Sequence, residues 1–184
     1  MKDSLYFIAL LAPDDVSAEI TAFKQHIAYN FNSSKALRVM PHIILLPPFK
    51  LSTLKHEGLN RWFLNASVSV SPFTIKLNGF GSFNNSKNPV IYVTPEEVEE
   101  LRLLQKELFN SFRTNYPEIK AILNFNPHMT IAYRDLSRED YEKAWLYYKD
   151  KAYAAGFAVN EVWLLQHNGK QWIPITRKQL NSTS

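Results

Sequence analysis

The chain has 184 residues, of which 46% are hydrophobic and 14% aromatic, and this is enough to build one domain with a full core. Its 21 Lys and Arg exceed its 17 Asp and Glu, and the net charge of +4 is compatible with a phosphate-bearing ligand without requiring one. The absence of cysteine excludes disulfides and thiolate chemistry and is typical of a reducing compartment, so we expect a cytoplasmic protein. We also expect it to be a monomer.

The first element is a predicted buried strand over residues 4–12, "SLYFIALLA". A signal peptide is disfavoured because Asp3 interrupts the leader and Pro13 follows in place of a small-residue cleavage site. No apolar run approaches the roughly 20 residues of a membrane-spanning helix, so we expect no membrane contact. A helix then begins with Pro13 at its first position. Its apolar face is formed by Val16, Ile20, Phe23, Ile27 and Phe31.

The same order of elements recurs from residue 90. The β-branched segment 90–93, "VIYV", predicts a short strand, and a helix follows it. Thr94 and Glu97 have the spacing of a capping box around Pro95. The helix carries one apolar face, formed by Val98, Leu101, Leu104, Leu108 and Phe112.

Each helix leads to a strand that carries Pro-His, "ALRVMPHIILL" in the first half and "AILNFNPHMTIAY" in the second. A Leu-Ser helix start follows each strand, at Ser52 and Ser137. The helix from Ser137 is predicted to turn inward Tyr141, Ala144, Trp145, Tyr148 and Ala152.

Each half closes with a further strand, from residue 71 and over 156–167. Asn168-Gly169 predicts a two-residue turn that pairs residues 162–167 with "KQWIPI". The polar segment 83–89, "FNNSKNP", joins the halves either as a linker or as a loop at the rim of a cleft. We therefore predict an α+β fold in which residues 1–184 form a single bilobal domain, a duplicated unit of strands and helices with pseudo-twofold symmetry around a central cleft. The lobes span approximately 1–82 and 89–184, with exchange of elements between them allowed.

The two Pro-His strands are the candidate site. Residues two apart in a strand share a face, so His42 projects beside Ile44 and His128 beside Thr130. A twofold axis would aim both imidazoles into one cleft. The intervening residues Ile43, Leu45, Met129 and Ile131 are predicted to point into the core.

Two facing imidazoles suit phosphodiester chemistry, because a neutral one can accept a proton from the attacking oxygen while a protonated one donates to the leaving oxygen. The Thr130 hydroxyl can donate to a phosphoryl oxygen, whereas Ile44 cannot. One Pro-His before an apolar strand is more often a capped strand edge than a catalyst. Two at matched places in a duplicated pattern favour function.

The segments "PHMTI", residues 127–131, and "PHIIL", residues 41–45, resemble the paired His-x-Thr/Ser-apolar motifs of the 2H phosphoesterase superfamily, which includes 2'-5' RNA ligase-like proteins and RNA cyclic phosphodiesterases. "GFGSF" and "LLQHNGKQW" extend the resemblance over nearly the whole chain. It implies a bilobal fold with a central groove, no cofactor, and metal-independent hydrolysis or transfer at 2',3'-cyclic or 2'-5' phosphodiesters of an RNA end or a small nucleotide.

Carried over by position, the resemblance makes His42 and His128 the catalytic pair and Thr130 the phosphate-binding hydroxyl, while Ile44 departs from the motif. By analogy His128 is the base that activates water and His42 the acid, with the opposite order left open. Loss of one hydroxyl is expected to lower activity about ten- to a hundredfold.

Further residues near the motifs are candidates for binding phosphate or a nucleobase. Arg134 follows the second motif closely and is the best further phosphate ligand. Phe83 and Tyr133 are candidates for stacking on a base, although Tyr133 shares strand parity with core residues. Basic side chains nearby are Arg38, Lys50 and Lys87, and the histidines predicted to be surface residues are His26, His56 and His167.

The composition gives little support to other chemistries. There are no cysteines or His-x-x-x-His pair for a metal, and no glycine-rich phosphate loop among the five glycines. The leading hypothesis is therefore a phosphodiesterase. A degenerate member that binds RNA or a nucleotide without catalysis is the alternative, and a protein-interaction module without a phosphate site is a third.

Overall fold

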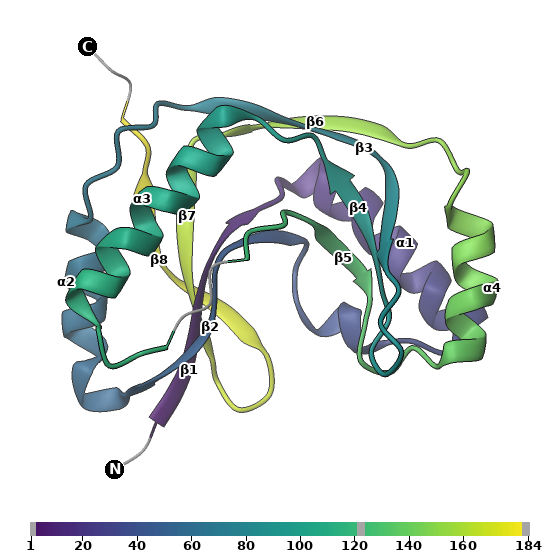
Figure 1. Ribbon diagram of the computed structural model, residues 1–184, viewed down its shortest axis with the longest axis horizontal. Helices are drawn as coiled ribbons and strands as arrows, with labels where there is room; N and C mark the ends of the chain where they lie inside the picture. Colours follow the sequence, from purple (N-terminus) through teal and green to yellow (C-terminus); the bar gives the residue numbers. More distant parts are fainter. Residues whose placement is uncertain (1–2, 121–123, 182–184) are drawn as a thin grey trace.

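The computed structural model describes residues 3–120 and 124–181. In these ranges the strands form two antiparallel sheets that curl toward each other (Figure 1). The first sheet has the order β2 (His42–Ser52), β1 (Asp3–Leu11), β7 (Glu161–His167), β8 (Trp172–Gln179). The second has the order β5 (Met129–Ala132), β4 (Val90–Pro95), β3 (Phe73–Phe83), β6 (Ala154–Val159).

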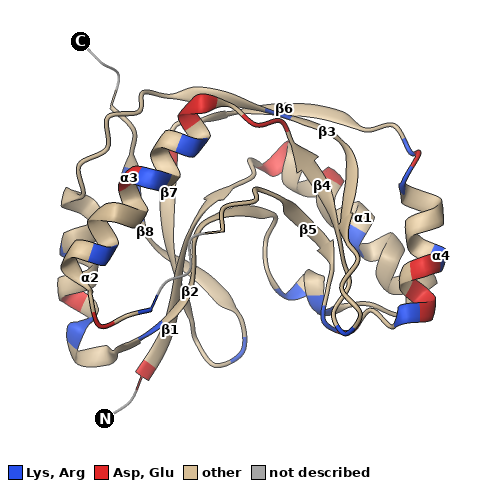
Figure 2. Cartoon of the chain, in the orientation of Figure 1, with Lys and Arg blue, Asp and Glu red and all other residues tan. Residues whose placement is uncertain are grey.

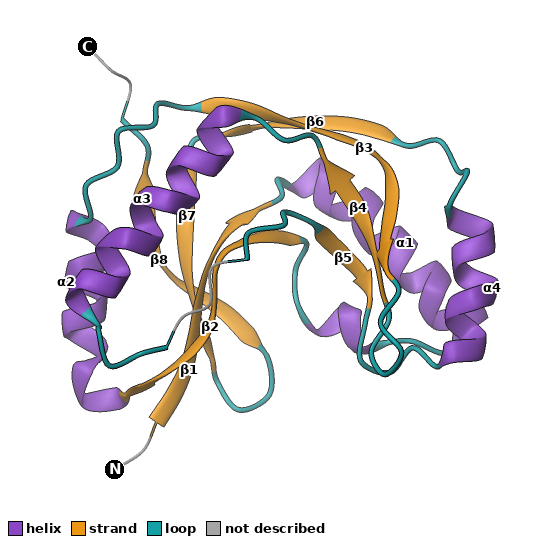
Figure 3. Cartoon of the chain, viewed as in Figure 1, coloured by secondary structure: helices purple, strands orange, loops and turns teal. Residues whose placement is uncertain are grey.

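Two pairs of helices cover the outer faces of the sheets (Figure 3). Helices α2 (His56–Asn65) and α3 (Glu99–Asn115) pack against the first sheet, on β8 and β2 respectively. Helices α1 (Asp14–Phe31) and α4 (Arg138–Tyr148) pack against each other and against the second sheet. The inner faces of both sheets are left for the centre of the molecule.

The chain consists of two units that share the order strand, helix, strand, helix, after which the second unit has more strands than the first. The first runs β1, α1, β2, α2, β3 and the second β4, α3, β5, α4, then β6 and β7. In each unit the first helix crosses to the opposite sheet, since α1 packs on the sheet of β5 and α3 on the sheet of β2. The strands β3 and β7 also cross, β3 to a place beside β4 and β7 to a place beside β1. The predicted duplicated α+β fold is confirmed, and its two halves exchange elements.

Because of this exchange, the two predicted lobes do not coincide with the two sheets. Neither sheet is a contiguous half of the chain divided at residues 82 and 89, because each contains strands from both units. The polar segment after Phe83 is the loop of the β3–β4 hairpin within the second sheet, not a linker between lobes.

The apolar faces predicted from periodicity pack against the core, although Phe23, Phe31, Val98 and Trp145 are only partly buried, and the element ends need correction. Pro13 is the N-cap of α1, one position before the helix. The capping box around Pro95 is wrong, because Pro95 pairs with Leu77 as the last residue of β4, and α3 begins at Glu99. Helix α4 ends at Tyr148, which leaves Ala152 exposed instead of inward-facing. The residues fully confirmed as buried in α3 are Leu101, Leu104, Leu108 and Phe112.

The C-terminal strands also differ from the prediction. Residues 156–167 are not one strand, because Asn160 separates β6 of the second sheet from β7 of the first. The β7–β8 pairing is confirmed, but His167 pairs with Trp172, so the hairpin loop has four residues, 168–171, and not two. The Asn168 side chain accepts hydrogen bonds from the backbone N–H groups of Lys170 and Gln171, which stabilises the longer loop. The predicted start of the second Pro-His segment, residues 121–123, lies outside the described residues.

Gly81 of β3 allows a close approach of an aromatic ring. A Cβ atom at this position would lie 2.5 Å from the ring of Tyr92, which is the residue opposite on β4. The Tyr92 ring is itself held between Phe83, at 4.6 Å between ring centroids, and His128, at 5.4 Å. Gly81 therefore sets the position of the aromatic support beside His128.

We predict that Gly81→Ala lowers the free energy of unfolding by about 1–3 kcal/mol, the usual cost of overpacking, as measured by urea denaturation. Gly58→Ala is the matched control. Gly58 is exposed on α2, and a Cβ atom there would have no other atom within 4 Å, so alanine should stabilise by about 0.5–1 kcal/mol. Equal effects of the two substitutions would contradict the assigned role of Gly81.

Candidate active site

The two Pro-His strands are edge strands that meet at the centre of the molecule. β2 lies at the edge of the first sheet and β5 at the edge of the second, and the two strands are in contact (Figure 1). A cavity of about 620 Å³ lies between the sheets at this point. Its lining comprises Leu5, Phe7, Ala36, Val39, His42, Ile44, Pro48, Val90, His128, Thr130, Tyr133, Arg134, His167 and Trp172.

The strand parity predicted from the sequence accounts for this lining. Ile43, Leu45, Met129 and Ile131 are all buried in the core, with exposures of 1% or less. The alternate residues of the same strands therefore face the cavity. Those that line it are His42, Ile44, His128 and Thr130.

Both imidazoles are held by equivalent hydrogen bonds, each to the backbone carbonyl two residues earlier. The Nδ1 atom of His42 donates to the carbonyl of Met40 at 2.7 Å, and Nδ1 of His128 donates to the carbonyl of Asn126, also at 2.7 Å. With Nδ1 protonated and engaged, Nε2 is the nitrogen left to each ring for a ligand.

The proline between each carbonyl and its histidine supports this geometry. Pro41 and Pro127 are buried, and a proline fixes its own φ while pushing the preceding residue into an extended conformation. The Pro41 carbonyl also accepts from the backbone N–H of Ala12, which attaches the turn to the end of β1. The Pro-His dipeptide therefore sets the ring orientation as well as the strand start.

The surroundings of His42 disfavour its protonated form. Its ring packs against Phe7 at 5.1 Å between centroids. Desolvation is the main cause that lowers the pKa of His42 to about 4, and the positive charges of Lys24 and His128 lower it further against the opposing effect of the Met40 carbonyl. His42 is consequently neutral at pH 7.

Lys24 is the unexpected member of these surroundings. It lies on α1, is only 2% exposed, and donates from Nζ to the carbonyl of Val39 at 2.8 Å. Burial lowers the pKa of Lys24 to about 8. The ammonium group thus holds the segment that precedes Met40 and places a positive charge near His42.

His128 lies against a different wall. Phe83 meets its ring edge-on at 5.0 Å between centroids, and the tilted ring of Tyr92 lies at 5.4 Å. Desolvation lowers the pKa of His128 below its ordinary value, opposed by the hydrogen bond to Asn126. Phe83, predicted as a candidate for stacking on a base, is therefore a support for the histidine and is not part of the cavity lining.

The end of β5 supplies two further lining residues. Tyr133 reaches the cavity although its strand parity predicts the core, because β5 ends at Ala132 and parity does not extend beyond it. Arg134 has a positive φ of 64°, an uncommon conformation for a residue with a side chain, and its guanidinium lies 5.3 Å from the ring of Tyr133. The strained turn thus brings both side chains to the cavity.

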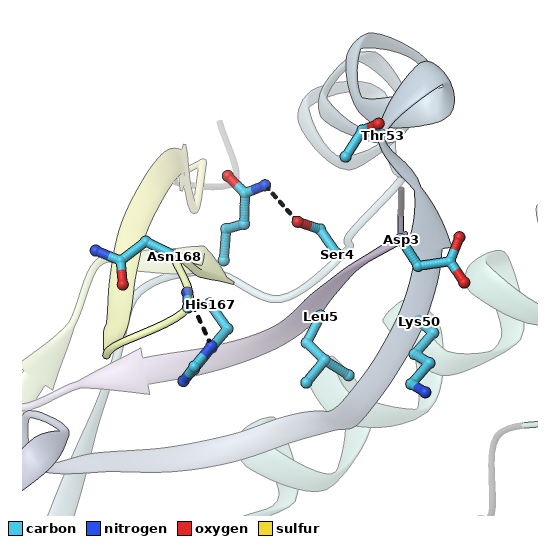
Figure 4. Close-up of a pocket in the computed structure, with 9 residues that line it drawn as sticks. Asp3, Ser4, Leu5, Lys50, Thr53, His167 and Asn168 are labelled. Atoms are coloured by element: carbon cyan, nitrogen blue, oxygen red, sulfur yellow. Dashed lines mark hydrogen bonds between the residues drawn. The ribbon is translucent and has the colours of Figure 1, made fainter. Parts of the chain in front are cut away.

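Two lining residues, His167 and Trp172, were not predicted from the sequence to lie in the cavity. His167, which was predicted to be a surface histidine, lines the cavity, and its Nδ1 accepts from the backbone N–H of Gly169 at 3.1 Å. Its ring packs on Trp172, which also lines the cavity, at 5.1 Å. Figure 4 shows that the side chains of His167, Leu5 and Lys50 extend to the same side of the first sheet, opposite Ser4. His167 and Trp172 both lie in the segment "LLQHNGKQW", whose resemblance to the family was the sequence feature that could have indicated their place in the cavity.

The other candidates lie outside the cavity. Arg38 lines a neighbouring pocket and Lys50 a pocket at the end of β1, while Lys87 is exposed in the β3–β4 loop. The predicted exposure of His26 and His56 is wrong, because both are half-buried and hydrogen-bonded to tyrosine hydroxyls, Tyr148 at 2.9 Å and Tyr6 at 3.0 Å.

Metal-binding clusters and membrane-spanning helices are both absent from the described parts of the chain. No group of three or more His, Asp or Glu side chains within residues 3–120 and 124–181 is placed to hold a metal ion. In the same ranges, no helix combines the length and the apolar character needed to cross a membrane.

Relatives in sequence match part of the chain. A protein of Bacillus licheniformis named "putative phosphoesterase" is 33% identical over 94 residues, which cover 51% of this chain and 53% of that protein. A Bacillus mycoides protein with the same designation is 34% identical over 99 residues, 54% of each chain. The chain therefore aligns with about half the length of the curated relatives it matches.

Solved structures match nearly the whole fold. The Thermus thermophilus protein TT0787 superimposes with a TM-score of 0.67 and 16% identity, covering 96% of this chain and 97% of that one. Escherichia coli LigT in its apo form has a TM-score of 0.67 at 17% identity, and LigT complexed with 3'-AMP has 0.66 at 18%, each covering 99% of this chain and 100% of LigT. These similarities show a shared fold.

A family model spans both histidine strands. The model of the 2'-5' RNA ligase superfamily matches residues 12–171, which include both Pro-His segments and the hairpin loop that carries Gly169. The chain belongs to the 2'-5' RNA ligase superfamily.

Proposed function

We propose that this protein is a phosphodiesterase that cleaves 2',3'-cyclic or 2'-5' phosphodiester bonds of RNA or small nucleotides by two-histidine acid–base catalysis without a metal. The observation that carries this proposal is the pair of equivalent imidazoles, one from each unit, that line a single cavity with Nδ1 engaged and Nε2 left for the ligand. Family membership and the LigT-like fold support it.

The electrostatics favour His42 as the base and His128 as the acid, the reverse of the order expected by analogy. His42 stays neutral because it is desolvated and lies near the Lys24 charge, so its Nε2 can accept a proton. In the proposed step, Nε2 of His42 removes a proton from water as the water oxygen bonds to phosphorus. Protonated His128 then gives its Nε2 proton to the ribose oxygen as the phosphorus–oxygen bond breaks.

The remaining polar lining suits the phosphate. The Thr130 hydroxyl and the Arg134 guanidinium can donate to phosphoryl oxygens, where charge develops during attack. Tyr133 and Trp172 provide aromatic surfaces for a nucleobase. Escherichia coli LigT has been solved in complex with 3'-AMP, and a nucleotide of this type is the ligand we assign to the cavity.

One observation favours a second candidate, a member that binds a nucleotide without turning it over. Ile44, at the position where the motif has a hydroxyl, packs against a small apolar cluster that contains Phe7. The phosphate would then have a donor on one side of the cavity only. Calorimetry with 3'-AMP combined with a turnover assay separates the candidates, since the binder has affinity without product.

We expect His42→Ala and His128→Ala each to lower kcat for a 2',3'-cyclic nucleotide by about 10²- to 10⁴-fold, the usual contribution of a general acid or base. Turnover is measured by chromatography in the presence of EDTA. Thermal unfolding is the control for folding and should stay close to wild type. Absence of wild-type turnover across a panel of cyclic nucleotides in EDTA would rule out the enzyme.

The pKa values predict an acidic optimum. Because kcat/KM requires neutral His42 and protonated His128, it should rise as pH increases through about 4 and fall as pH passes the lowered pKa of His128. Lys24→Met removes a positive charge near His42, so the pKa of His42 should rise and the acidic limb should move to higher pH.

The pKa of His42 is followed by NMR independently of activity. Lys178→Met is the matched control, because Lys178 also donates to a backbone carbonyl, that of Leu64, and burial also lowers its pKa. If the two variants leave the pKa of His42 equally unchanged, Lys24 does not control the base.

Ile44→Thr restores the motif hydroxyl beside His42 and should raise kcat/KM for a cyclic nucleotide by about tenfold or more, since a hydrogen bond to a charged group contributes about 1.5–3 kcal/mol. Ile44→Val keeps the β-branched shape without the hydroxyl and should leave the rate unchanged. An equal response of both variants would show that this half of the cavity does not use a hydroxyl.

A further inference from the structure

A second, strongly basic pocket adjoins the active cavity. It has a volume of about 300 Å³ and shares with the cavity Val39, Tyr133, Arg134, His167 and Trp172. The residues that it adds are Lys35, Arg38, Lys170 and Gln171. The two spaces therefore have a common wall, which includes Arg134 and Trp172.

Three segments distant in the sequence are brought together to form this basic pocket. The short 3-10 helix Lys35–Arg38 follows α1, the turn with Arg134 follows β5, and Lys170 lies in the β7–β8 loop. Asp135 ties the first two segments, since its carboxylate accepts hydrogen bonds from the Ser33 hydroxyl at 2.8 Å and from the backbone N–H groups of Ser34 and Lys35 at 2.9 and 3.0 Å. The pocket is held by side-chain bonds as well as by loop conformation.

The charges of the basic pocket are not neutralised by ion pairs with any described residue. Its lining contains four cationic side chains, those of Lys35, Arg38, Arg134 and Lys170, and no acidic residue among the described ones. None of the four forms a salt bridge within residues 3–120 and 124–181. Asp135, the nearest acid in sequence, uses its oxygens for the bonds that tie the segments. Figure 2 shows basic positions on the β7–β8 loop and on the short helix after α1, with no acidic position on either segment.

We propose that the basic pocket is a subsite for a second phosphate group of the ligand whose reacting phosphate lies between the histidines. This rests on the proposed function. Uncompensated cations that share a wall with the catalytic cavity are the arrangement that binds a phosphate chain, because each phosphate releases counterions and accepts charge-assisted hydrogen bonds. The substrate is therefore a nucleotide with at least two phosphates, and an RNA strand that ends in the reacting phosphodiester supplies the second one.

The test compares ligands that differ by one phosphate. Calorimetry at pH 7 measures the affinity of the full chain for 3'-AMP and for adenosine 3',5'-bisphosphate. We expect the bisphosphate to bind at least about tenfold more tightly and this ratio to fall as salt is raised. Arg38→Gln and Lys170→Gln should each reduce the ratio by about threefold or more. Lys106→Gln, which removes an exposed charge on α3, is the control and should leave it unchanged.

A third ligand distinguishes the sources of the second phosphate. A diadenosine dinucleotide with a 3'-phosphate should gain affinity as the bisphosphate does if a strand occupies the subsite, whereas a gain limited to the bisphosphate would assign the subsite to a small nucleotide. The subsite would be overturned if the wild-type protein bound neither the bisphosphate nor the dinucleotide more tightly than 3'-AMP. It would also be overturned if Arg38→Gln and Lys170→Gln left these affinity ratios unchanged. If a cyclic mononucleotide is bound and hydrolysed while the ratio is one, the subsite alone is overturned, whereas no binding of any of the ligands would overturn the proposed function as well.

Discussion

The hydrogen bond from each cavity imidazole to the carbonyl two residues earlier is the constraint on which the site depends. An unrestrained imidazole can rotate and can carry its proton on either nitrogen, and neither freedom is compatible with directed proton transfer. Here Nδ1 is engaged at 2.7 Å in both strands, and the intervening Pro41 and Pro127 limit the backbone conformations that could break the bond.

The duplication supplies two similar histidines, but acid–base catalysis requires two unequal ones. The neighbours that differ between the units provide the inequality. His42 lies near the buried Lys24 and beside Ile44, whereas His128 lies beside Thr130 with Arg134 at the end of its strand. The first half of the cavity is consequently more apolar and holds a neutral imidazole, and the second half carries the side chains that we propose as donors to a phosphate. Ile44, which departs from the motif, contributes to this difference between the surroundings of His42 and His128.

Much of this arrangement could be predicted from local pattern. Strand parity placed Ile44 and Thr130 beside the histidines, and helical periodicity identified the buried faces. The exchange of β3 and β7 between sheets could not be predicted, because alternation shows which face of a strand is buried and not which sheet the strand joins. Lys24 was missed because a lysine at a helical position is expected to be exposed. His167 was missed because its role depends on the hairpin lying across the cavity.

In the proposed complex, the position of the basic pocket determines how the ligand lies. The wall that contains Phe7, Ile44 and Trp172 offers apolar and aromatic surface, which suits a base or ribose better than a phosphate. The cations Lys35, Arg38, Arg134 and Lys170 line the adjoining basic pocket together with Trp172. If a phosphate lies between the histidines, the ligand group on the side of the apolar wall should be apolar, and the group on the side of the basic pocket should be anionic. A nucleotide chain satisfies both, because its bases and its phosphates leave the reacting phosphorus in different directions.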